Sequence, residues 1–314
     1  DPGAAVAAGL VAFAIGSETS GSILTPSAYC GVTGLRPTYG LVSRHGAMAL
    51  SWTLDKLGPM TRTADDAAIV LSAIAGADPA DETCTGRKFP WSGPAVYKKP
   101  WRIAVPKGCV EKVQPAVRDN FEAALKAMGG AITVTRDVEF PDQPWGPAVS
   151  AIVSAEGAAA FVDLLESGDV TKLRCPADHT GGYSGLLLPA VDYIQALRAR
   201  KPMRAAMAKL FQTYDAIATP TRATVAYPAD KKFEDAYPGV SGGPAVIPAG
   251  NLAGLPALAM PTGFGENGLP IVTSGSTSLS GARACAIREA SFWQLAIAFS
   301  SYAWISVSSK MARV

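Results

Sequence analysis

The sequence is poor in the side chains that bind metals and form disulfides. Its 314 residues include two histidines, His45 and His179, which is too little material for a histidine-based zinc site. The five cysteines are widely spaced, form no CxxC pair and are odd in number. A disulfide framework is not expected in a chain of this length. We therefore expect no metal, free thiols and a reducing, cytoplasmic compartment.

Long apolar runs and blocks of one charge are also missing. No stretch of about 18 uninterrupted apolar residues occurs, which argues against a membrane-spanning helix. The 28 basic and 26 acidic side chains give a net charge of +2 and are interspersed along the chain. We therefore expect neither nucleic acid nor a membrane as a partner.

Apolar residues are abundant, at 48%, and 31 glycines and 24 prolines supply many turns. Residues 101–108, 114–128 and 131–140 have the patterns of a strand, an amphipathic helix and a strand, which predicts a βαβ unit on a parallel sheet. Residues 63–75 predict a helix that Thr63 caps, with Asp65 and Asp66 in its first turn.

The remaining elements follow from shorter patterns. The small apolar residues at the start predict a buried helix over 3–10 and then a buried strand over 12–15. Two or three helices are expected between 147 and 213, and Pro202 is expected to kink or split the one at 191–214. The sequence further predicts helices at 147–166 and 191–214, buried strands at 215–221 and 255–261, loops over 222–249, a helical turn at 251–254 and helical stretches after Pro270.

A Gly/Ser-rich stretch, GSETSGS, follows the first apolar run at residues 16–22. Small residues leave backbone N–H groups uncovered, and a turn built from them can point several at one spot. A serine hydroxyl beside such donors has what acyl transfer needs, namely a nucleophile and donors for an oxyanion. From composition alone, an ordinary Ser/Gly loop between two elements is the more common explanation of such a stretch.

The wider segment GSETSGSILTPSAYCGVTGLRPTYG, residues 16–40, is similar to the core of the amidase signature family. The similarity continues over residues 43–76 and reappears at 214–221 and 250–264. It implies an α/β fold with a mixed, largely parallel central sheet flanked by helices on both faces. It also implies one large domain over residues 1–314, from which the N-terminal part of the family domain is absent.

The resemblance implies which residues form the site. Family members use a Ser–cis-Ser–Lys triad, and the nucleophile corresponds to Ser22 here. The oxyanion hole corresponds to the backbone N–H groups of Thr19, Ser20, Gly21 and Ser22 itself. The shuttle serine and the lysine would precede Asp1. No cofactor is implied.

Several other polar residues in the matched segments are interpreted as structural. Lys56 and His45 could act as a base only if they came within hydrogen-bond reach of the transferred proton. A buried, inert thiol is the expected state of Cys30. Structural ion pairs are the expected role of Arg36 and Asp55.

One departure from the family pattern bears on the substrate. The family often has an arginine two residues after the nucleophile, and Leu24 stands there in this sequence. Since leucine cannot pair with a carboxylate, we expect Leu24 to contact a neutral amide. A second departure is the segment after Pro270, which fits the family pattern poorly.

Three functional hypotheses remain open. The first is an amidase that hydrolyses a neutral carboxylic amide through a serine acyl-enzyme. The second is a glutamine-dependent amidotransferase component of the A type. The third is an inactive fragment or homologue with a binding role. The expected partner is a small-molecule amide, and a homodimer is left open.

Overall fold

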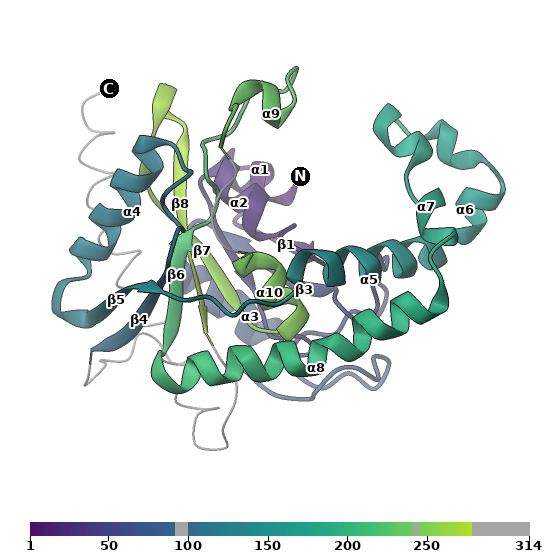
Figure 1. Ribbon diagram of the computed structural model, residues 1–314, viewed down its shortest axis with the longest axis horizontal. Helices are drawn as coiled ribbons and strands as arrows, with labels where there is room; N and C mark the ends of the chain where they lie inside the picture. The colour runs from purple at the N-terminus through teal and green to yellow at the C-terminus, as the bar shows by residue number, and fades with distance from the viewer. Residues whose placement is uncertain (92–99, 241–244, 278–314) are drawn as a thin grey trace.

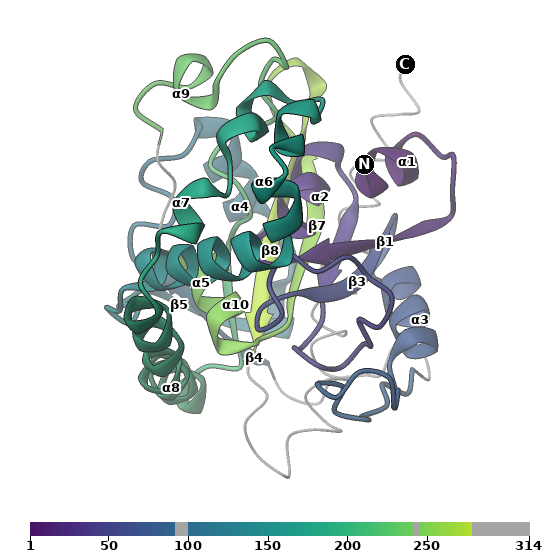
Figure 2. The same ribbon diagram turned by 90° about the vertical axis from the view of Figure 1, so that its right-hand side faces the viewer.

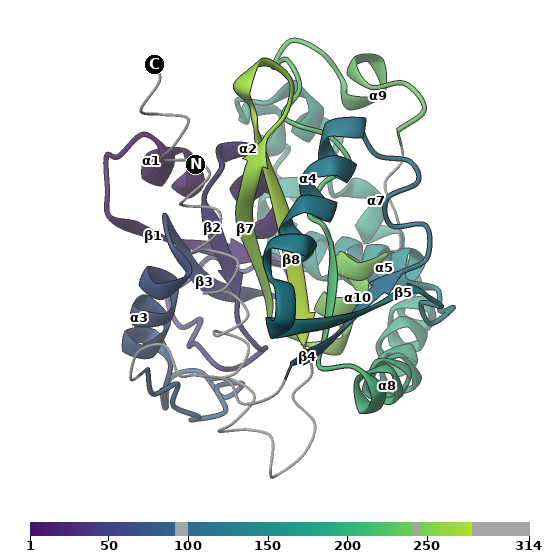
Figure 3. The same ribbon diagram turned by 90° about the vertical axis from the view of Figure 1, so that its left-hand side faces the viewer.

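The computed structural model describes residues 1–91, 100–240 and 245–277, which fold around a central sheet (Figures 1–3). The sheet has eight strands in the order β1-β3-β2-β7-β8-β6-β4-β5. The strands are β1 (Phe13–Glu18), β2 (Thr33–Arg36), β3 (Lys56–Thr61), β4 (Trp101–Pro106), β5 (Ile132–Val138), β6 (Ala216–Pro220), β7 (Ala257–Phe264) and β8 (Pro270–Thr277).

Helices cover both faces of this sheet, as expected. They are α1 (Pro2–Ala7), α2 (Leu24–Cys30), α3 (Ala64–Ile74), α4 (Pro115–Ala127), α5 (Trp145–Ala160), α6 (Val162–Glu166), α7 (Tyr183–Leu186), α8 (Ala190–Thr213), α9 (Phe233–Ala236) and α10 (Val246–Ala253). The described residues also contain four short 3-10 turns: η1 (Gly129–Ala131), η2 (Asp169–Lys172), η3 (Pro176–Thr180) and η4 (Glu266–Gly268).

Alternate residues of the central strands point to opposite faces and build two cores. In β4, Ile103 packs with α3 and α4, whereas Ala104 packs with α5, α8 and α10. In β6, Ala216 and Ala218 join the first core and Ile217 joins the second. This period of two is what buries both faces of a strand under helices. Figure 3 shows α4 over one face, and Figure 2 shows α5, α8 and α10 over the other.

The α/β class and the mixed sheet are confirmed, but the expected parallel majority is wrong. Only the pairs β4–β5 and β4–β6 are parallel, and the other five pairs within the described residues are antiparallel. The connection between β7 and β8 is short, and a short connection can join only antiparallel strands.

Several local predictions are confirmed. The β4–α4–β5 unit is parallel, as its pattern indicates. The Thr63 hydroxyl accepts the N–H of Asp66 at 3.1 Å and caps α3. Helix α8 runs through Pro202 without a break, so the expected split is wrong. Buried Met203 and Met207 hold the helix to the core on the C-terminal side of the proline.

Other predictions are corrected. Strand β1 lies at the edge of the sheet with Phe13 and Ile15 exposed, so the predicted buried strand over 12–15 is wrong. Residues 270–277 form strand β8 rather than a helix, and α10 begins at Val246, earlier than the helical turn predicted at 251–254. The rest of the predicted C-terminal helical stretches lies outside the described residues. None of the helices described here combines the length and the apolar character needed to cross a membrane.

Candidate active site

The first part of the Gly/Ser stretch ends β1 at Glu18, and the residues after it form a turn that leads into α2. Gly21, at φ 111°, adopts a backbone conformation that residues with a side chain rarely take, and its carbonyl accepts the N–H of Thr25 at 2.8 Å. Helix α2 starts at Leu24 with no hydrogen bond from the Ile23 side chain to its free N–H groups, and it ends at the left-handed Gly31. The cap on the start of α2 therefore has to come from elsewhere.

That cap is the carboxylate of Glu18, the last residue of β1. One oxygen, Oε2, accepts the backbone N–H groups of Ile23 at 3.0 Å and Leu24 at 3.1 Å. The other, Oε1, accepts Nη1 of Arg36 at 2.8 Å and Nδ2 of Asn251 at 2.9 Å. Glu18 is wholly buried, so all four bonds form away from water. The carboxylate closes the turn by tying its two ends together.

The electrostatics around Glu18 keep it ionised. Burial by itself raises the pKa of this carboxyl, but the charges of Arg36 and Lys56 and the hydrogen bonds from Arg36 and Asn251 outweigh it and lower the pKa. Arg36 is also buried, and its Nε donates to the carbonyl of Leu255 at 3.1 Å. The ion pair predicted for Arg36 thus exists and supports the turn.

A second anchor holds the start of the turn. The Thr19 hydroxyl donates to Oδ1 of Asp55 at 2.5 Å. The other oxygen of Asp55 accepts the backbone N–H groups of Leu50 at 2.8 Å and Ser51 at 2.9 Å. Asp55 is a positioning residue that acts through hydrogen bonds, and the ion pair expected of it is not found among the described residues.

The backbone donors left over are those that the family resemblance assigns to the oxyanion hole. In residues 1–91, 100–240 and 245–277, the N–H groups of Thr19, Ser20, Gly21 and Ser22 donate to no acceptor. The next two N–H groups along the chain, on Ile23 and Leu24, are taken by Glu18. Ser22 is exposed, and its hydroxyl makes no hydrogen bond within the same described part of the chain. The turn therefore offers four consecutive donors beside an accessible hydroxyl.

Leu24 does not occupy the place expected of it. Its side chain is 1% exposed and packs in a core cluster with Ala28, Ala257, Ala259 and Val272. A side chain buried between α2 and the sheet has no surface for a ligand. The expected substrate contact by Leu24 is therefore corrected, and the neutral-amide prediction loses the residue on which it rested.

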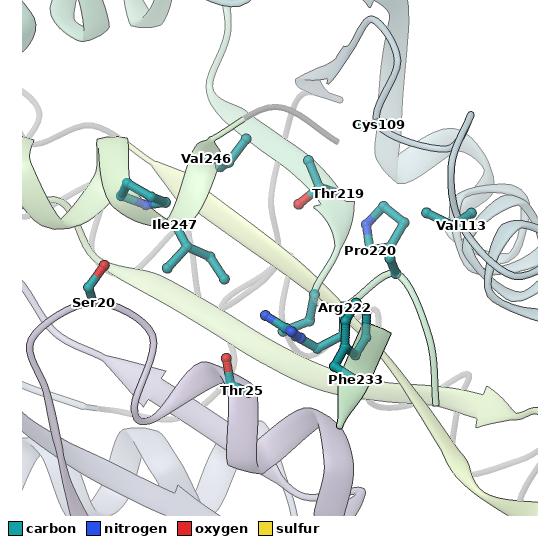
Figure 4. Close-up of a pocket in the computed structure, with 13 residues that line it drawn as sticks. Ser20, Thr25, Cys109, Val113, Thr219, Pro220, Arg222, Phe233, Val246 and Ile247 are labelled. Carbon is teal, nitrogen blue, oxygen red and sulfur yellow. The ribbon is translucent and has the colours of Figure 1, made fainter. Parts of the chain in front are cut away.

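A cavity of about 320 Å³ opens next to the turn (Figure 4). Ser20 and Thr25 line it from the turn and α2, and Ile247 lines it from α10. The segment after β6 contributes Arg222, which was not singled out from the sequence. Cys109 also lines the cavity, and burial raises the pKa of its thiol to about 11, so it stays neutral.

None of the alternative bases hydrogen-bonds to the Ser22 hydroxyl within the described residues, although Lys56 lies opposite Glu18 in the β1–β3 pair. Lys56 is buried, its Nζ donates to the carbonyl of Leu54, and burial together with the charge of Arg36 lowers its pKa well below the usual value. His45 lines a different cavity with Ser17, and the His179 ring contacts the carbonyl of Leu173 at 2.7 Å. Cys30 is half-buried, and burial raises the pKa of its thiol. In the described residues, no cluster of three or more His, Cys, Asp or Glu side chains could hold a metal ion.

Sequence reasoning overlooked Glu18, Asn251 and Arg222. A signal existed for Glu18, because an acidic residue stands at this place in the matched family pattern, and for Asn251, which lies in the matched segment 250–264. Arg222 follows the matched segment 214–221 and belongs to no short motif.

Comparison with known proteins places the chain. A family model described as Amidase matches residues 2–274. The chain belongs to the amidase family. The Gly/Ser turn, α2 and strands β1 to β7 all lie inside the matched range, which ends within β8.

The relatives are longer than this chain. It is 37% identical over 298 residues to the A-type component of the glutamyl-tRNA(Gln) amidotransferase of Lysinibacillus sphaericus, a match that covers 85% of this chain and 60% of the relative. Other curated relatives, such as the same component in Bacillus cytotoxicus, match over the same share. The chain thus spans about 60% of the length of these amidase-family relatives.

Two solved structures have the same fold. The A-type component of the glutamyl-tRNA(Gln) amidotransferase of Thermotoga maritima superposes with a TM-score of 0.74 at 29% identity, covering 95% of this chain and 64% of that one. The peptide amidase of Stenotrophomonas maltophilia gives 0.70 at 28% identity, with 96% and 64% covered. Both an amidotransferase component and a peptide amidase are therefore similar to this member of the amidase family.

Proposed function

We propose that this chain supplies the nucleophile and the oxyanion hole of an amide hydrolase. Oγ of Ser22 attacks the carbonyl carbon of the amide and forms an acyl-enzyme. The C–N bond breaks, and ammonia or an amine leaves with the proton that Ser22 gives up. Water then cleaves the ester and releases the carboxylic acid.

The observation that carries the proposal is the set of four N–H groups on Thr19 to Ser22 that find no acceptor in the described part of the chain and lie beside an exposed hydroxyl. An oxyanion needs two or three donors at about 3 Å, and losing one typically costs about 10²–10³ in rate. Glu18 supports this arrangement because it occupies the next two N–H groups and holds the turn closed. The donors are backbone groups, so Ser20 serves as well as a glycine.

In the family that this chain resembles, a serine and a lysine transfer the proton. Neither of them matches a position in this sequence. The proposal for these residues therefore covers attack and oxyanion stabilisation, which are the roles that the turn can perform. Lys56 is not proposed as the base, since its amine is buried against the Leu54 carbonyl.

An assay of ammonia release tests the proposal. We expect Ser22→Ala to lose about 10³-fold or more of the amide hydrolysis measured with a panel of small amides. Ser17→Ala is the matched control, because Ser17 is an exposed serine of β1 whose hydroxyl is not in the turn. Equal rates for Ser22→Ala and Ser17→Ala would contradict the assignment.

A second candidate, the ammonia-releasing component of an amidotransferase, is favoured by the names of the curated relatives. It makes a different prediction in the same assay: glutamine is the best amide, and a partner protein raises the rate. Ammonia release from simple amides without a partner favours the stand-alone hydrolase.

A further inference from the structure

The cavity next to the nucleophile turn contains one charged side chain. Of the residues that line it within the described part of the chain, Arg222 alone carries a charge. Its neighbours in the lining are apolar or uncharged, such as Thr25, Ile247 and Phe233. Figure 4 shows the Arg222 guanidinium between Thr25 and Ile247 on the side of the cavity that faces Ser20. A half-buried cation in such surroundings attracts an anion strongly.

Aromatic side chains hold this arginine in place. Nε of Arg222 donates to the Tyr29 hydroxyl at 3.2 Å, and the guanidinium carbon lies 5.6 Å from the centre of the Tyr29 ring. Tyr29 packs edge-to-face on Tyr227 at 6.0 Å, and Tyr227 packs on Phe233 at 5.7 Å. The guanidinium is therefore held by the Tyr29 side chain, through the Tyr29 hydroxyl and ring.

The outer edge of the guanidinium is left free. Within residues 1–91, 100–240 and 245–277, Nη1 and Nη2 of Arg222 donate to no acceptor, and no carboxylate pairs with the side chain. This contrasts with Arg36, which is paired with Glu18 and bonded to a backbone carbonyl. Two parallel N–H donors on a planar group match the two oxygens of a carboxylate.

We propose that Arg222 binds a carboxylate carried by the amide substrate and thereby selects carboxylate-bearing amides over neutral ones. The inference rests on the proposed function, because it takes the turn beside this cavity as the reaction centre. It replaces the neutral-amide prediction, whose basis was Leu24. Both a half-amide of a dicarboxylic acid and an amino acid with an amide side chain carry the required carboxylate.

Direct binding tests the proposal without depending on turnover. In the Ser22→Ala protein, the affinities for succinamate and for its neutral counterpart succinamide are measured by calorimetry. We expect succinamate to bind about tenfold more tightly or better, since a charge-assisted pair contributes on the order of one decade or more. Arg222→Gln should remove this preference, and Arg222→Lys should keep part of it. Arg198→Gln, a change of an exposed arginine on α8, should leave it intact.

The outcomes separate this inference from the proposed function. The role of Arg222 is overturned if the Ser22→Ala protein binds both ligands equally or does not bind succinamate. It is also overturned if Arg222→Gln leaves the preference for succinamate unchanged. Circular dichroism confirms that each variant is folded, and Arg222→Lys provides the result if Arg222→Gln is not. L-glutamine as a third ligand distinguishes an amino-acid amide from a half-amide. Retained hydrolysis in Ser22→Ala would instead refute the nucleophile while leaving the binding result standing.

Discussion

Replacing Glu18 by glutamine perturbs the turn at the group that closes it. The variant keeps the size of the side chain but removes the charge that faces Arg36, and it turns an amide NH₂ toward N–H donors. Breaking a buried ion pair by changing one partner costs about 3–5 kcal/mol, because the other charge stays buried without compensation. Arg36 and Glu18 are 1% and 0% exposed, so water cannot relieve that cost.

We therefore expect Glu18→Gln to lower the free energy of unfolding by about 3–5 kcal/mol, measured by urea denaturation at pH 7. Glu234→Gln, at an exposed position on α9, is the control and should stay within about 0.5 kcal/mol. Adding Arg36→Met to Glu18→Gln should cost less than the sum of the two single changes, because the orphaned charge is gone. A loss of stability below about 1 kcal/mol for Glu18→Gln would contradict the conclusion that the buried Glu18 carboxylate holds the turn.

The same group gives the stability a pH dependence of known sign. The pKa of Glu18 is lower in the folded protein than its ordinary value of 4.5. Its contribution is therefore complete above pH 4.5 and is lost as the pH falls through the lowered folded value. Glu18→Gln should remove this part of the acid limb of the stability curve.

Three further predictions concern the surroundings of the turn. Gly21→Ala should cost about 1–3 kcal/mol of stability and slow hydrolysis, because φ is 111° at this position and the new Cβ would lie 3.3 Å from Ile247. Denaturation midpoints and hydrolysis rates equal to those of the unchanged protein would contradict this. Gly250→Ala should lower the stability of the protein by about 1 kcal/mol or more despite the helix propensity of alanine, because the new Cβ would overlap Nη2 of Arg36. Thermal melting measures this loss, and a variant that melts at a higher temperature would contradict the prediction. The lowered pKa of Lys56 means that stability rises with pH up to the ordinary lysine value of 10.5, and Lys56→Met should flatten this rise in urea titrations from pH 7 to about 10; an unchanged slope would contradict it.

The sequence predicted those elements that carry their own cap or a clear period of apolar residues. Helix α3 has its own cap at Thr63, and the β4–α4–β5 unit shows its period in each element. Strand β1 was harder, because its small apolar residues suggest burial, yet as an edge strand it leaves Phe13 and Ile15 exposed. Strand β8 combines strand-favouring Ile271 and Val272 with the run Ser274 to Ser276, which includes a glycine, so its local pattern is mixed. Its two antiparallel ladders, to β6 and β7, decide its conformation.

The site was predicted in part for the same reason. Ser22 and its neighbours lie in one continuous motif, so resemblance could point to them. Glu18 holds that motif through hydrogen bonds to Arg36, 18 residues away, and to Asn251, 233 residues away, and only the fold brings these residues together. Leu24 was misplaced because its position in the motif gives no information on which side of α2 meets the sheet. Arg222 reaches the cavity from the segment after β6, where no motif marks it.

Covalent labelling of the nucleophile tests the central claim most directly. The folded protein is treated with a fluorophosphonate, and the modified peptide is located by mass spectrometry. The account predicts one adduct, on Ser22, that is absent from Ser22→Ala and retained in Ser17→Ala. An adduct on another serine, undiminished labelling of Ser22→Ala, or a folded protein that takes up no label would contradict it.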